Sequence, residues 1–313
     1  MGNNQSAELR KKTSNTVPEQ SLNRNAPYYL PRTNEDIDRL QMQHFLLQHV
    51  WQSNYSAPIQ QQLKDHKMRV LDAGCGPGTW LLEMASGNQI VEFYGVDIQP
   101  VFPTEIKPAN LKFYIADLKD NVPFENQYFD YIRISLLNWC LSADEWPVIL
   151  KELFRVLRPG GWLEIAEIDQ TKFVDGPNLG LLTKIFAELS TQRKVIPNIS
   201  EHLPSFLTLC FPSTPIHHDT RSFLLGPRGG QIGTIYLEQI NMFMTASIAP
   251  HVKKTLNMTD EDYAKFWKGC IKELEEVDYD IKCSRFWVQR KLETAAKKGR
   301  TEILVDQRET TKF

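Results

Sequence analysis

The sequence predicts an α/β fold in which helices cover a mostly parallel β-sheet. Five short runs rich in β-branched and aromatic residues alternate with helical patterns, and this order is typical of a parallel sheet. A glycine-rich stretch directly follows the first run, where a strand would turn into a helix. With 313 residues and 42% hydrophobic content, the chain is long enough to bury one large core.

The five runs are expected to form the central strands, over residues 69–73, 91–97, 111–117, 128–135 and 162–169. Between them we expect one helix from near Gly78, a weakly defined one after Pro103, and one from Ser142 to Leu157. The segment Arg158-Pro159-Gly160-Gly161 should end the last of these helices, because proline and glycine stop a helix and favour a turn.

Further elements are expected on both sides of this core. Apolar residues at helical spacing predict an amphipathic helix over 34–51 before the first strand. After the fifth strand come a helix near 178–194, a proline-rich passage, a strand over 219–225 and two helices over 231–251 and 259–277. A last strand over 280–288 should form an antiparallel hairpin with the strand at 219–225, at one edge of the sheet.

These patterns predict one domain with a tail at each end. Residues 1–26 are polar and are expected to be a disordered N-terminal tail. The domain is expected over 27–292, with its core at 66–170 and a helical insertion at about 230–278. Residues 293–313 form a charged C-terminal tail.

Composition favours a globular protein of a reducing compartment. The net charge of -2, with scattered basic residues, gives no signal for nucleic-acid binding. The five cysteines are far apart and form no CxxC pair, so no metal site is expected. No charged N-terminal region is followed by an apolar one, and no run of about 18 apolar residues occurs, so neither secretion nor a membrane span is expected. We expect a cytoplasmic protein, and the sequence is also compatible with the nucleus.

The N-terminus matches a lipidation pattern. MGNNQS fits M-G-x-x-x-[ST], with Gly2 as the acceptor of a myristoyl group, and a basic cluster at 10–12 follows. One myristoyl chain binds membranes reversibly, so a nearby basic cluster would strengthen peripheral attachment. An unmodified disordered tail is the equal alternative.

The glycine-rich stretch RVLDAGCGPGTW is a candidate nucleotide cradle. Asp72 ends the strand and Gly74, Gly76 and Gly78 follow at every second position. A phosphate-binding Walker loop would need a GK[ST] ending, which is absent. The dinucleotide fingerprint needs a third glycine or alanine where Thr79 stands. Both spacings therefore disfavour phosphate-bearing cofactors.

With an acid two residues before GxGxG, this stretch resembles motif I of class I S-adenosylmethionine-dependent methyltransferases. Asp97 ends the second strand, where a carboxylate can accept hydrogen bonds from both ribose hydroxyls, and dinucleotide enzymes use such an acid too. Asp117 in YIADL resembles the family acid that receives the adenine amino group, and FDYIRIS and LRPGGWLEIAEID resemble the family's fourth and fifth strands. The resemblance implies S-adenosyl-L-methionine as cofactor and a Rossmann-like, seven-stranded sheet with an antiparallel last strand.

A narrower resemblance covers residues from about Tyr28 to Arg290. The opening YYLPRTNEDIDRL and the segment GGQIGTIYLEQINMFMTASIAPHVKKTLNMTDEDYAKFW are similar to the fungal LaeA-like and trans-aconitate-methyltransferase-like branch. Many members have GTGTGIW where this chain has GCGPGTW, which keeps every glycine. Substrates in this branch are mostly unassigned, and some members look like regulators.

Candidates for catalysis come from segments expected over the carboxyl ends of the strands. Tyr28 and Tyr29 resemble family residues that fold over the cofactor, and pinning of the N-terminal segment to the core is an equal alternative. Glu167 and Asp169 end the fifth strand, where one of them can bind or deprotonate an acceptor, or both can be solvated loop acids.

Other residues near these segments are weaker candidates. Arg133, together with Ser135 and Trp139, follows the fourth strand and can border the cofactor's methyl group, although ordinary packing is the better interpretation for Trp139. His44 and His49 do not share one helix face and are expected to be structural or exposed. His217-His218-Asp219 is interpreted as a turn before a strand rather than a metal site.

The leading functional hypothesis is S-adenosylmethionine-dependent methyl transfer to an unidentified acceptor, expected to be a small molecule. The alternative is a LaeA-like regulatory protein that binds the cofactor or partner proteins with little turnover. The apolar helix from Gln231 onward can form a lid or partner surface, although core packing is favoured.

Overall fold

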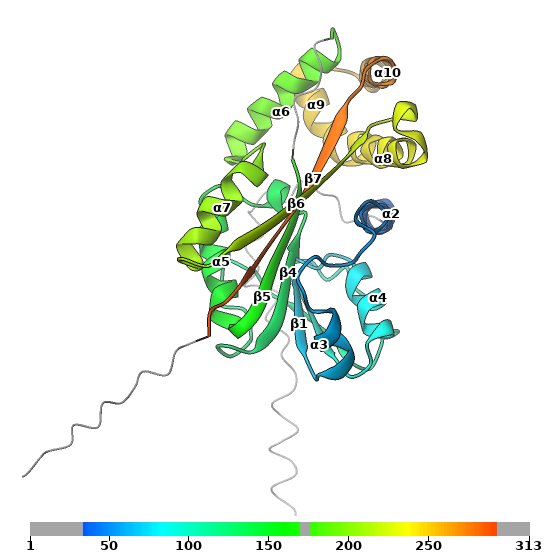
Figure 1. Cartoon of the computed structure of the whole chain (residues 1–313). Helices are drawn as coiled ribbons and strands as arrows, with labels where there is room; N and C mark the ends of the chain where they lie inside the picture. The colour runs from blue at the N-terminus through cyan, green and yellow to red at the C-terminus, as the bar shows by residue number, and fades with distance from the viewer. Residues whose placement is uncertain (1–33, 170–175, 293–313) are drawn as a thin grey trace, which may run out of the picture.

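The computed structural model describes residues 34–169 and 176–292 (Figure 1). Seven strands form one sheet in the order β3-β2-β1-β4-β5-β7-β6. The strands are β1(Arg69–Ala73), β2(Glu92–Asp97), β3(Leu111–Ile115), β4(Phe129–Ser135), β5(Leu157–Ile168), β6(Ile216–Leu224) and β7(Asp280–Gln289). β1 to β5 pair in parallel, whereas β7 is antiparallel to both β5 and β6. The predicted fold class and the antiparallel hairpin at one edge of the sheet are confirmed.

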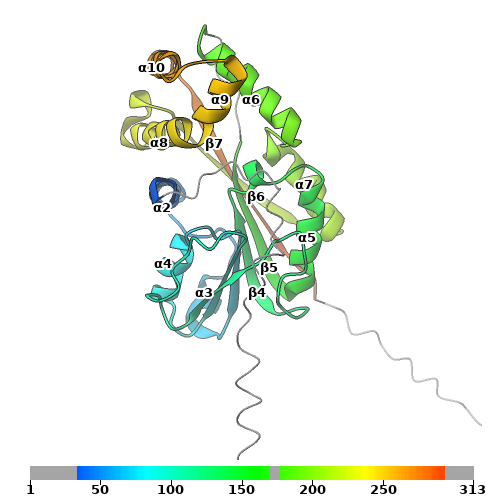
Figure 2. The same cartoon turned by 180° about the vertical axis from the view of Figure 1, so that it is seen from behind.

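Helices cover both faces of the sheet and extend beyond the carboxyl ends of its parallel strands (Figures 1 and 2). The helices are α2(Asn34–Trp51), α3(Gln60–Asp65), α4(Thr79–Gly87), α5(Glu145–Val156), α6(Leu179–Arg193), α7(Ile199–Cys210), α8(Gly230–Met242), α9(Ala249–Leu256) and α10(Asp260–Glu276). Shorter turns are the 3-10 segments η2(Asn138–Cys140) and η3(Pro227–Gly229) and the π-helical turn η4(Phe243–Ile248).

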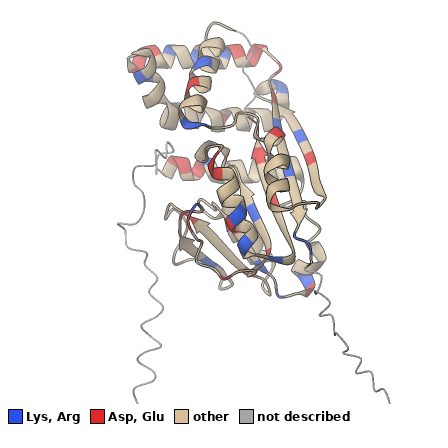
Figure 3. Cartoon of the chain, turned by 90° about the vertical axis from the view of Figure 1, so that its left-hand side faces the viewer, with Lys and Arg blue, Asp and Glu red and all other residues tan. Residues whose placement is uncertain are grey.

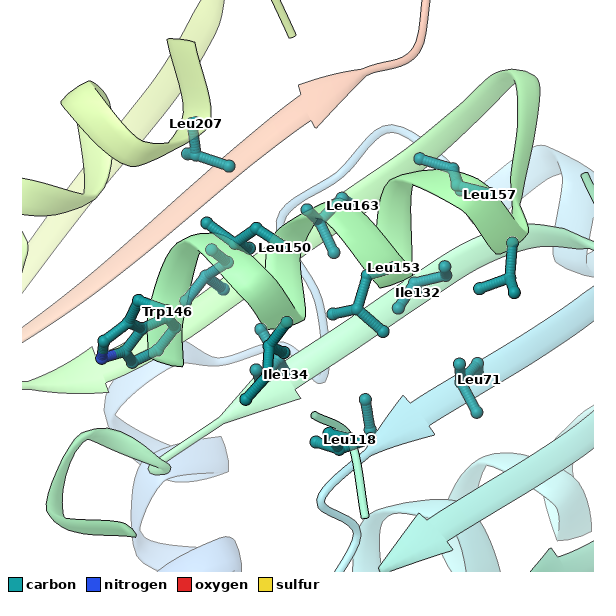
Figure 4. Close-up of a cluster of buried hydrophobic side chains, with 14 of the residues drawn as sticks. Leu71, Leu118, Ile132, Ile134, Trp146, Leu150, Leu153, Leu157, Leu163 and Leu207 are labelled. Carbon is teal, nitrogen blue, oxygen red and sulfur yellow. The ribbon is translucent and has the colours of Figure 1, made fainter. Parts of the chain in front are cut away.

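The largest core lies where α5 and α7 pack on one face of the sheet (Figure 4). Trp146 and Leu150 of α5 and Leu207 of α7 are completely buried against Ile132 and Leu163 of β4 and β5. Apolar residues recur along α5 at positions 146, 149, 150, 153 and 156, so one stripe of the helix faces the strands. This packing holds the strands in register beneath the candidate site.

Two further cores complete the molecule. On the other face, Trp80 and Leu81 of α4 pack with α3 residues against β1 and β2. Beyond the carboxyl ends of the parallel strands, α2, α6, α8, α9 and α10 form a third core with the start of β7. Figure 1 shows α2 running between α4 and α8, so the first helix joins the sheet layer to the helical insertion.

The helical insertion between β6 and β7 differs from its expectation in one place. A single helix was expected over 231–251, but α8 passes through the π-helical turn η4 into α9. Pro250 lacks the backbone N–H that a regular α-helix would use there, and π-turns accommodate such a break. α10 begins as predicted, because Thr259 accepts a hydrogen bond from the Asp262 N–H and Asp262 bonds back, which is a complete capping box.

Four other local predictions were wrong. Residues 98–110 form turns and bends instead of a helix after Pro103. β5 begins at Leu157 rather than 162, because a bulge opposite Phe129 lets the Pro-Gly-Gly segment extend the strand. The proline-rich passage contains α7, whose Pro204 lies inside the helix. His217 and His218 lie within β6 and not in a turn.

Charged residues of both signs lie on the side of the molecule that Figure 3 shows. In Figure 3, Lys and Arg segments are interspersed with Asp and Glu segments along the helices and strands that face the viewer. Across residues 34–169 and 176–292, every helix is too short or too polar to cross a membrane.

Candidate functional site

The glycine loop between β1 and α4 forms the base of the candidate site. Gly74, Gly76 and Gly78 have φ angles of 75°, 52° and 74°, in the region that only glycine adopts at low cost. The backbone N–H groups of Gly74 and Cys75 both donate to the Val96 carbonyl, at 2.7 and 3.0 Å. The loop is therefore closed against the end of β2.

The three glycines have different surroundings. A Cβ atom at Gly74 would lie 2.5 Å from the Leu137 side chain, and one at Gly78 would lie 2.6 Å from the Phe113 ring. A Cβ atom at Gly76 would meet only Leu40, at 4.0 Å. Protein packing therefore explains two of the glycines, whereas Gly76 leaves space that the described side chains do not fill.

Asp97 connects the end of β2 to this loop. Its carboxylate accepts hydrogen bonds from the backbone N–H groups of Gly76, at 2.7 Å, and Gln99, at 2.8 Å. Burial raises the pKa of Asp97 to about 6, and the two backbone hydrogen bonds oppose that rise. The structure thus places two predicted cofactor-binding residues, Gly76 and Asp97, in direct contact.

Asp72 and Arg133, also predicted at the cofactor site, form an ion pair with each other. Arg133 Nη1 lies 2.8 Å from Asp72 Oδ1, and the Asp72 side chain is 2% exposed. The Arg133 guanidinium also lies over the Trp80 ring, 4.9 Å from its centroid. Burial raises the pKa of Asp72, which the charge of Arg133 partly offsets. The pair fixes the Arg133 side chain next to the glycine loop.

Asp117 lies two residues beyond β3, at the side of the site. It accepts a hydrogen bond from the Lys119 N–H at 3.0 Å, and the Lys119 ammonium lies 3.6 Å from its carboxylate. The Lys119 ammonium also forms an ion pair with Glu145, with Nζ 3.0 Å from Oε1. The predicted adenine contact of Asp117 remains a prediction.

The helix α2 lies above the glycine loop and is held there by a polar cluster. His44 Nε2 lies 2.8 Å from the Glu83 carboxylate of α4, and Gln48 and Asn54 also bond to Glu83. Burial lowers the pKa of His44, so its ring favours the neutral form at pH 7. The sequence does not indicate this cluster, because His44 and Glu83 are distant in sequence and no local pattern links them.

The two carboxylates at the end of β5 hold different segments, Glu167 the loop after β4 and Asp169 the start of α7. Glu167 accepts hydrogen bonds from the N–H groups of Leu137, at 2.8 Å, and Asn138, at 3.4 Å, and burial raises its pKa to about 8. Asp169 accepts from the Ser200 N–H and hydroxyl, at 3.0 and 2.5 Å, at the start of α7. Both predicted acids are buried and bonded to the protein rather than being solvated loop acids.

Leu136, the first residue of that loop, has a φ angle of +56°, which is strained for a side chain of this size. Its neighbour Leu137 packs on the glycine loop at Gly74. Trp139 stacks edge-on against Phe186 of α6 and partly belongs to the third core, which agrees with the packing role favoured for it. Glu167 thus holds the loop that covers one end of the glycine turn.

Three buried polar atoms at the carboxyl ends of the strands have no hydrogen-bond partner. They are Thr79 Oγ1 after the glycine loop, Gln99 Oε1 after β2 and Ser135 Oγ at the end of β4. Asn138 Oδ1, in the loop after β4, is unpaired as well, and other unpaired atoms lie elsewhere in the described chain. The unpaired atoms at this end of the sheet are compatible with a polar ligand there. An adenosyl ligand with hydroxyl, amine and carboxylate groups fits this set and the space at Gly76.

The other sequence candidates are not placed at the site by the described residues. Gly2, Tyr28 and Tyr29 are outside the described residues. His217 stacks on Trp287 and His218 on Phe286, with ring centroids 5.6 and 4.2 Å apart. Within the described chain, no three His, Cys, Asp or Glu side chains are grouped as metal ligands.

Residues 70–161 match the family model of a methyltransferase domain. Among curated relatives, the protein-methionine methyltransferase LaeA of Emericella nidulans is 34% identical over 148 residues, which are 47% of this chain and 38% of that protein. The secondary metabolism regulator LAE1 of Cochliobolus heterostrophus is 33% identical over 43% of this chain and 45% of its own. Methyltransferase PytC of Aspergillus terreus is 30% identical over 45% and 41%. The chain therefore spans less than half the length of these relatives.

Distant similarity to solved structures is also found. Phosphoethanolamine N-methyltransferase 2 of Haemonchus contortus, in complex with S-adenosyl-L-methionine, is 17% identical with a TM-score of 0.47, over 80% of this chain and 57% of that one. A methyltransferase of Methanosarcina mazei is 18% identical with a TM-score of 0.46, over 76% and 99%. The matched domain includes the glycine loop, Asp97 and the first four strands, and the curated relatives are LaeA-like proteins. Residues 70–161 therefore form a methyltransferase domain, and over less than half of its length the chain is similar to LaeA-like, S-adenosylmethionine-dependent methyltransferases.

Proposed function

We propose that this protein binds S-adenosylmethionine at the glycine loop and transfers its methyl group to an acceptor above β4 and β5. The observation that carries this proposal is the hydrogen bond between the Gly76 N–H and the Asp97 carboxylate. It lies beside a space at Gly76 that the described side chains do not fill. A carboxylate at the end of β2 can accept hydrogen bonds from both ribose hydroxyls, while a glycine backbone allows close approach of a ligand.

The remaining residues of the site have roles that follow from their contacts. Arg133, held by Asp72, presents its cation beside the glycine loop, where it can pair with the carboxylate of the cofactor's methionine part. Asp117 can accept the adenine amino group. Leu137, held by Glu167, covers one end of the glycine turn and helps to exclude water.

The bound cofactor supplies a methyl group on a sulfonium, and the protein's task is to align the acceptor in line with it. A base is needed only for an acceptor that must lose a proton. Among the described residues, Glu167 and Asp169 are bonded to backbone or Ser200, and His44 bonds to Glu83 through Nε2 alone. A neutral imidazole that is oriented by a carboxylate can act as a base, so His44 is the described candidate for an acceptor that must lose a proton. Neutral amines, carboxylates and thioethers react without such a base.

Two classes of acceptor are compatible with this chemistry. A small molecule is the first candidate. The second is a methionine side chain of a protein, because a relative is named a protein-methionine methyltransferase and a thioether carries no proton to remove. A regulatory role with little turnover remains the alternative to both.

The function is tested by incubating the full chain with cell extract and S-adenosylmethionine labelled in its methyl group. Label in small molecules is expected, and the Asp97→Ala variant should transfer much less. Label confined to proteins would replace the first acceptor class with the second. If the natural protein binds S-adenosylmethionine, Asp97→Ala weakens that binding and neither protein transfers label, the regulatory alternative is favoured.

A further inference from the structure

Strand β6 forms an open edge of the sheet. Within residues 34–169 and 176–292 it pairs with β7 alone, and its other side faces no strand. In Figure 1 the middle of β6 lies in front of the sheet, with α7 on one side and α2 and α8 on the other. His217, His218, Arg221 and Ser222 in this middle part are exposed. The edge therefore presents backbone groups to which another strand can bond.

The hydrogen bonds of the β6–β7 hairpin show which backbone groups of β6 point outward. Directly after β6, the Leu225 N–H donates to the Tyr279 carbonyl at 2.8 Å. Residues of an antiparallel strand face the partner strand and the open side in alternation. The odd-numbered residues of β6 therefore bond to β7, and the even-numbered ones point to the open side. Thr220 agrees with this assignment, because its N–H donates to the side chain of its neighbour Asp219 at 2.8 Å.

The open stretch of this edge runs from Ile216 to Ser222. At the far end, a Cβ atom at Gly233 would lie 2.3 Å from the Leu224 carbonyl oxygen, so the start of α8 covers that residue. Sheet edges are commonly protected by proline, by lysine, by a bulge or by being short. β6 has nine residues, none of them proline or lysine, and it pairs with β7 without a register shift. The edge thus lacks most of the devices that prevent strand pairing.

Charge is arranged symmetrically on this stretch. Asp219 and Arg221 lie on one face on either side of Thr220, with Arg221 Nη2 3.0 Å from Asp219 Oδ2. Their side chains are 42% and 54% exposed, so both retain polar atoms that can pair with another molecule. An antiparallel copy of β6 centred on Thr220 places each Asp219 opposite the Arg221 of the other copy. The charges of the two copies then alternate in one cross-strand network.

Other registers of the same pairing are disfavoured. Because the even-numbered residues carry the outward backbone groups, the register can shift only in steps that keep even residues opposite even residues. The nearest shift in one direction places Asp219 opposite Asp219, and the nearest shift in the other places Arg221 opposite Arg221. Like charges directly opposite each other destabilise a strand pair. The charges therefore select the register centred on Thr220.

We propose that β6 pairs with β6 of a second copy of this chain, in an antiparallel register centred on Thr220. On pairing, the Thr220 N–H bonds to the carbonyl of the partner's Thr220, and the Asp219 carboxylate that it leaves pairs with the partner's Arg221. The two sheets then continue across the two-fold axis. β4, β5 and β7 separate this edge from β1 and its glycine loop, so the inference does not depend on the proposed methyl transfer.

Sedimentation velocity of the full chain, from micromolar to sub-millimolar concentration, tests the proposal. We expect a reversible equilibrium between monomer and dimer for the natural protein. Asp219→Arg places arginine opposite arginine, and Arg221→Asp places aspartate opposite aspartate, so each variant alone should dimerise at least about tenfold more weakly. An equimolar mixture of the two variants should form heterodimers, because every arginine then faces an aspartate. The double variant Asp219→Arg/Arg221→Asp should dimerise as the natural protein does.

Asp144→Arg is the matched control, because it makes the same change of charge at an exposed ion pair with Lys194 outside β6. It should dimerise as the natural protein does. Thr220→Cys tests the register, because paired Cα atoms of an antiparallel ladder lie about 5.5 Å apart, within the range of disulfides. Under mild oxidation Thr220→Cys should form a covalent dimer that the natural protein does not form. Ser222→Cys, which has no cysteine opposite it, should not form that dimer.

Thermal unfolding and titration with S-adenosylmethionine show whether each variant is folded. A natural protein that is monomeric at every concentration overturns the proposal, as it would if another protein or an end of this chain occupied the edge. A dimer that persists in both single variants, or single variants that form no heterodimer on mixing, also overturns it. Cross-linking of Ser222→Cys without cross-linking of Thr220→Cys would contradict the register.

Discussion

At the scale of single residues, Gly76 differs from the other glycines of its loop. All three have positive φ angles, but only at Gly76 would an added Cβ meet no protein atom closer than 4.0 Å. The strain of a left-handed alanine is common to the loop, at about 1–2 kcal/mol. Close packing against neighbouring side chains therefore accounts for Gly74 and Gly78, whereas the open space at Gly76 is explained by ligand binding.

Gly76→Ala is expected to lower affinity for S-adenosylmethionine at least about tenfold while lowering the unfolding free energy by about 1 kcal/mol. The matched Gly78→Ala variant should unfold more easily, because its Cβ would lie 2.6 Å from Phe113. Calorimetry and urea unfolding measure the two effects. Unchanged affinity in Gly76→Ala would mean that no ligand group approaches this residue.

Asp97 makes cofactor binding dependent on pH. Its pKa is raised to about 6 from 3.8, so the folded protein retains its proton more readily than the unfolded chain. Ribose hydroxyls need the ionised form as acceptor, so affinity should be constant above pH 7 and fall by up to about tenfold per unit below pH 6. Titrations between pH 5 and 8 measure this dependence.

Asp97→Asn provides the control for that pH dependence. The variant should bind weakly at every pH, without the fall below pH 6. Because the raised pKa costs stability as pH rises from about 4 to 6, Asp97→Asn should also gain stability relative to the natural protein over that interval. A pH profile identical in both proteins would assign the dependence to another group.

Site residues could be predicted from the sequence where they belong to one short motif with fixed spacing. The glycine loop and Asp97 lie within a short stretch with fixed spacing, and the structure places them in contact. The buried state of Glu167 was not predictable, because it arises from the amides of Leu137 and Asn138 on a different strand's loop. The cluster of His44 with Glu83 likewise depends on how α2 crosses α4.

At the scale of elements, α10 is the helix whose start the sequence indicates best. Thr259 and Asp262 bond to each other's backbone N–H groups, which satisfies two donors that a helix start leaves unpaired. Thr259→Ala should reduce the free energy of unfolding by about 1 kcal/mol. Thr234→Ala, which removes only a bond to the Gly230 carbonyl within α8, is the control.

Urea unfolding measures both threonine variants. Equal stability of Thr259→Ala and the natural protein would show that α10 is held by its packing alone. The buried face of α10, which includes Tyr263, Phe266, Trp267 and Cys270, supplies that packing.

The missed elements share a cause. α7 lies in the passage that was expected only to be proline-rich and contains Pro204. Its first residues are capped by Asp169, and its apolar side chains are buried in the largest core. β5 begins at Leu157, before the expected residue 162, because Phe129 of β4 pairs with Leu157 across a bulge. In both cases a distant partner outweighs the local propensity.

At the scale of the molecule, a buried ion pair links the antiparallel edge to the centre of the sheet. Glu164 of β5 is 1% exposed, lies 3.8 Å from Arg285 of β7 and accepts hydrogen bonds from the Ser56 and Ala57 N–H groups. Arg285 also lies over Trp51 at the end of α2, 4.5 Å from its ring centroid. Strand, loop and first helix therefore meet at one charged pair.

Removing one partner of this pair should destabilise the protein more than removing both. Arg285→Met is expected to cost about 3 kcal/mol of unfolding free energy, because it leaves the Glu164 charge buried without its cation. Arg285→Met combined with Glu164→Gln should cost less than Arg285→Met alone, and therefore less than the sum of the single variants. Strictly additive values in urea unfolding would mean that the two charges do not interact.

The mostly parallel, seven-stranded sheet with an antiparallel last strand followed from a resemblance and the pattern of five strands, whereas this ion pair did not. Glu164 and Arg285 are separated by the whole helical insertion, and each alone looks like a solvated residue. The sequence could therefore predict the architecture of the sheet but not the contacts that fasten its edge strands to α2.

The central claim is that the glycine loop and Asp97 hold S-adenosylmethionine rather than a dinucleotide. Calorimetric titration of the full chain with S-adenosylmethionine, S-adenosylhomocysteine and NAD tests it most directly. The account predicts one site for each adenosyl ligand, no NAD binding, and a loss of about 1.5–3 kcal/mol of binding free energy in Asp97→Ala. Tight binding of NAD with no response to the adenosyl ligands would contradict it.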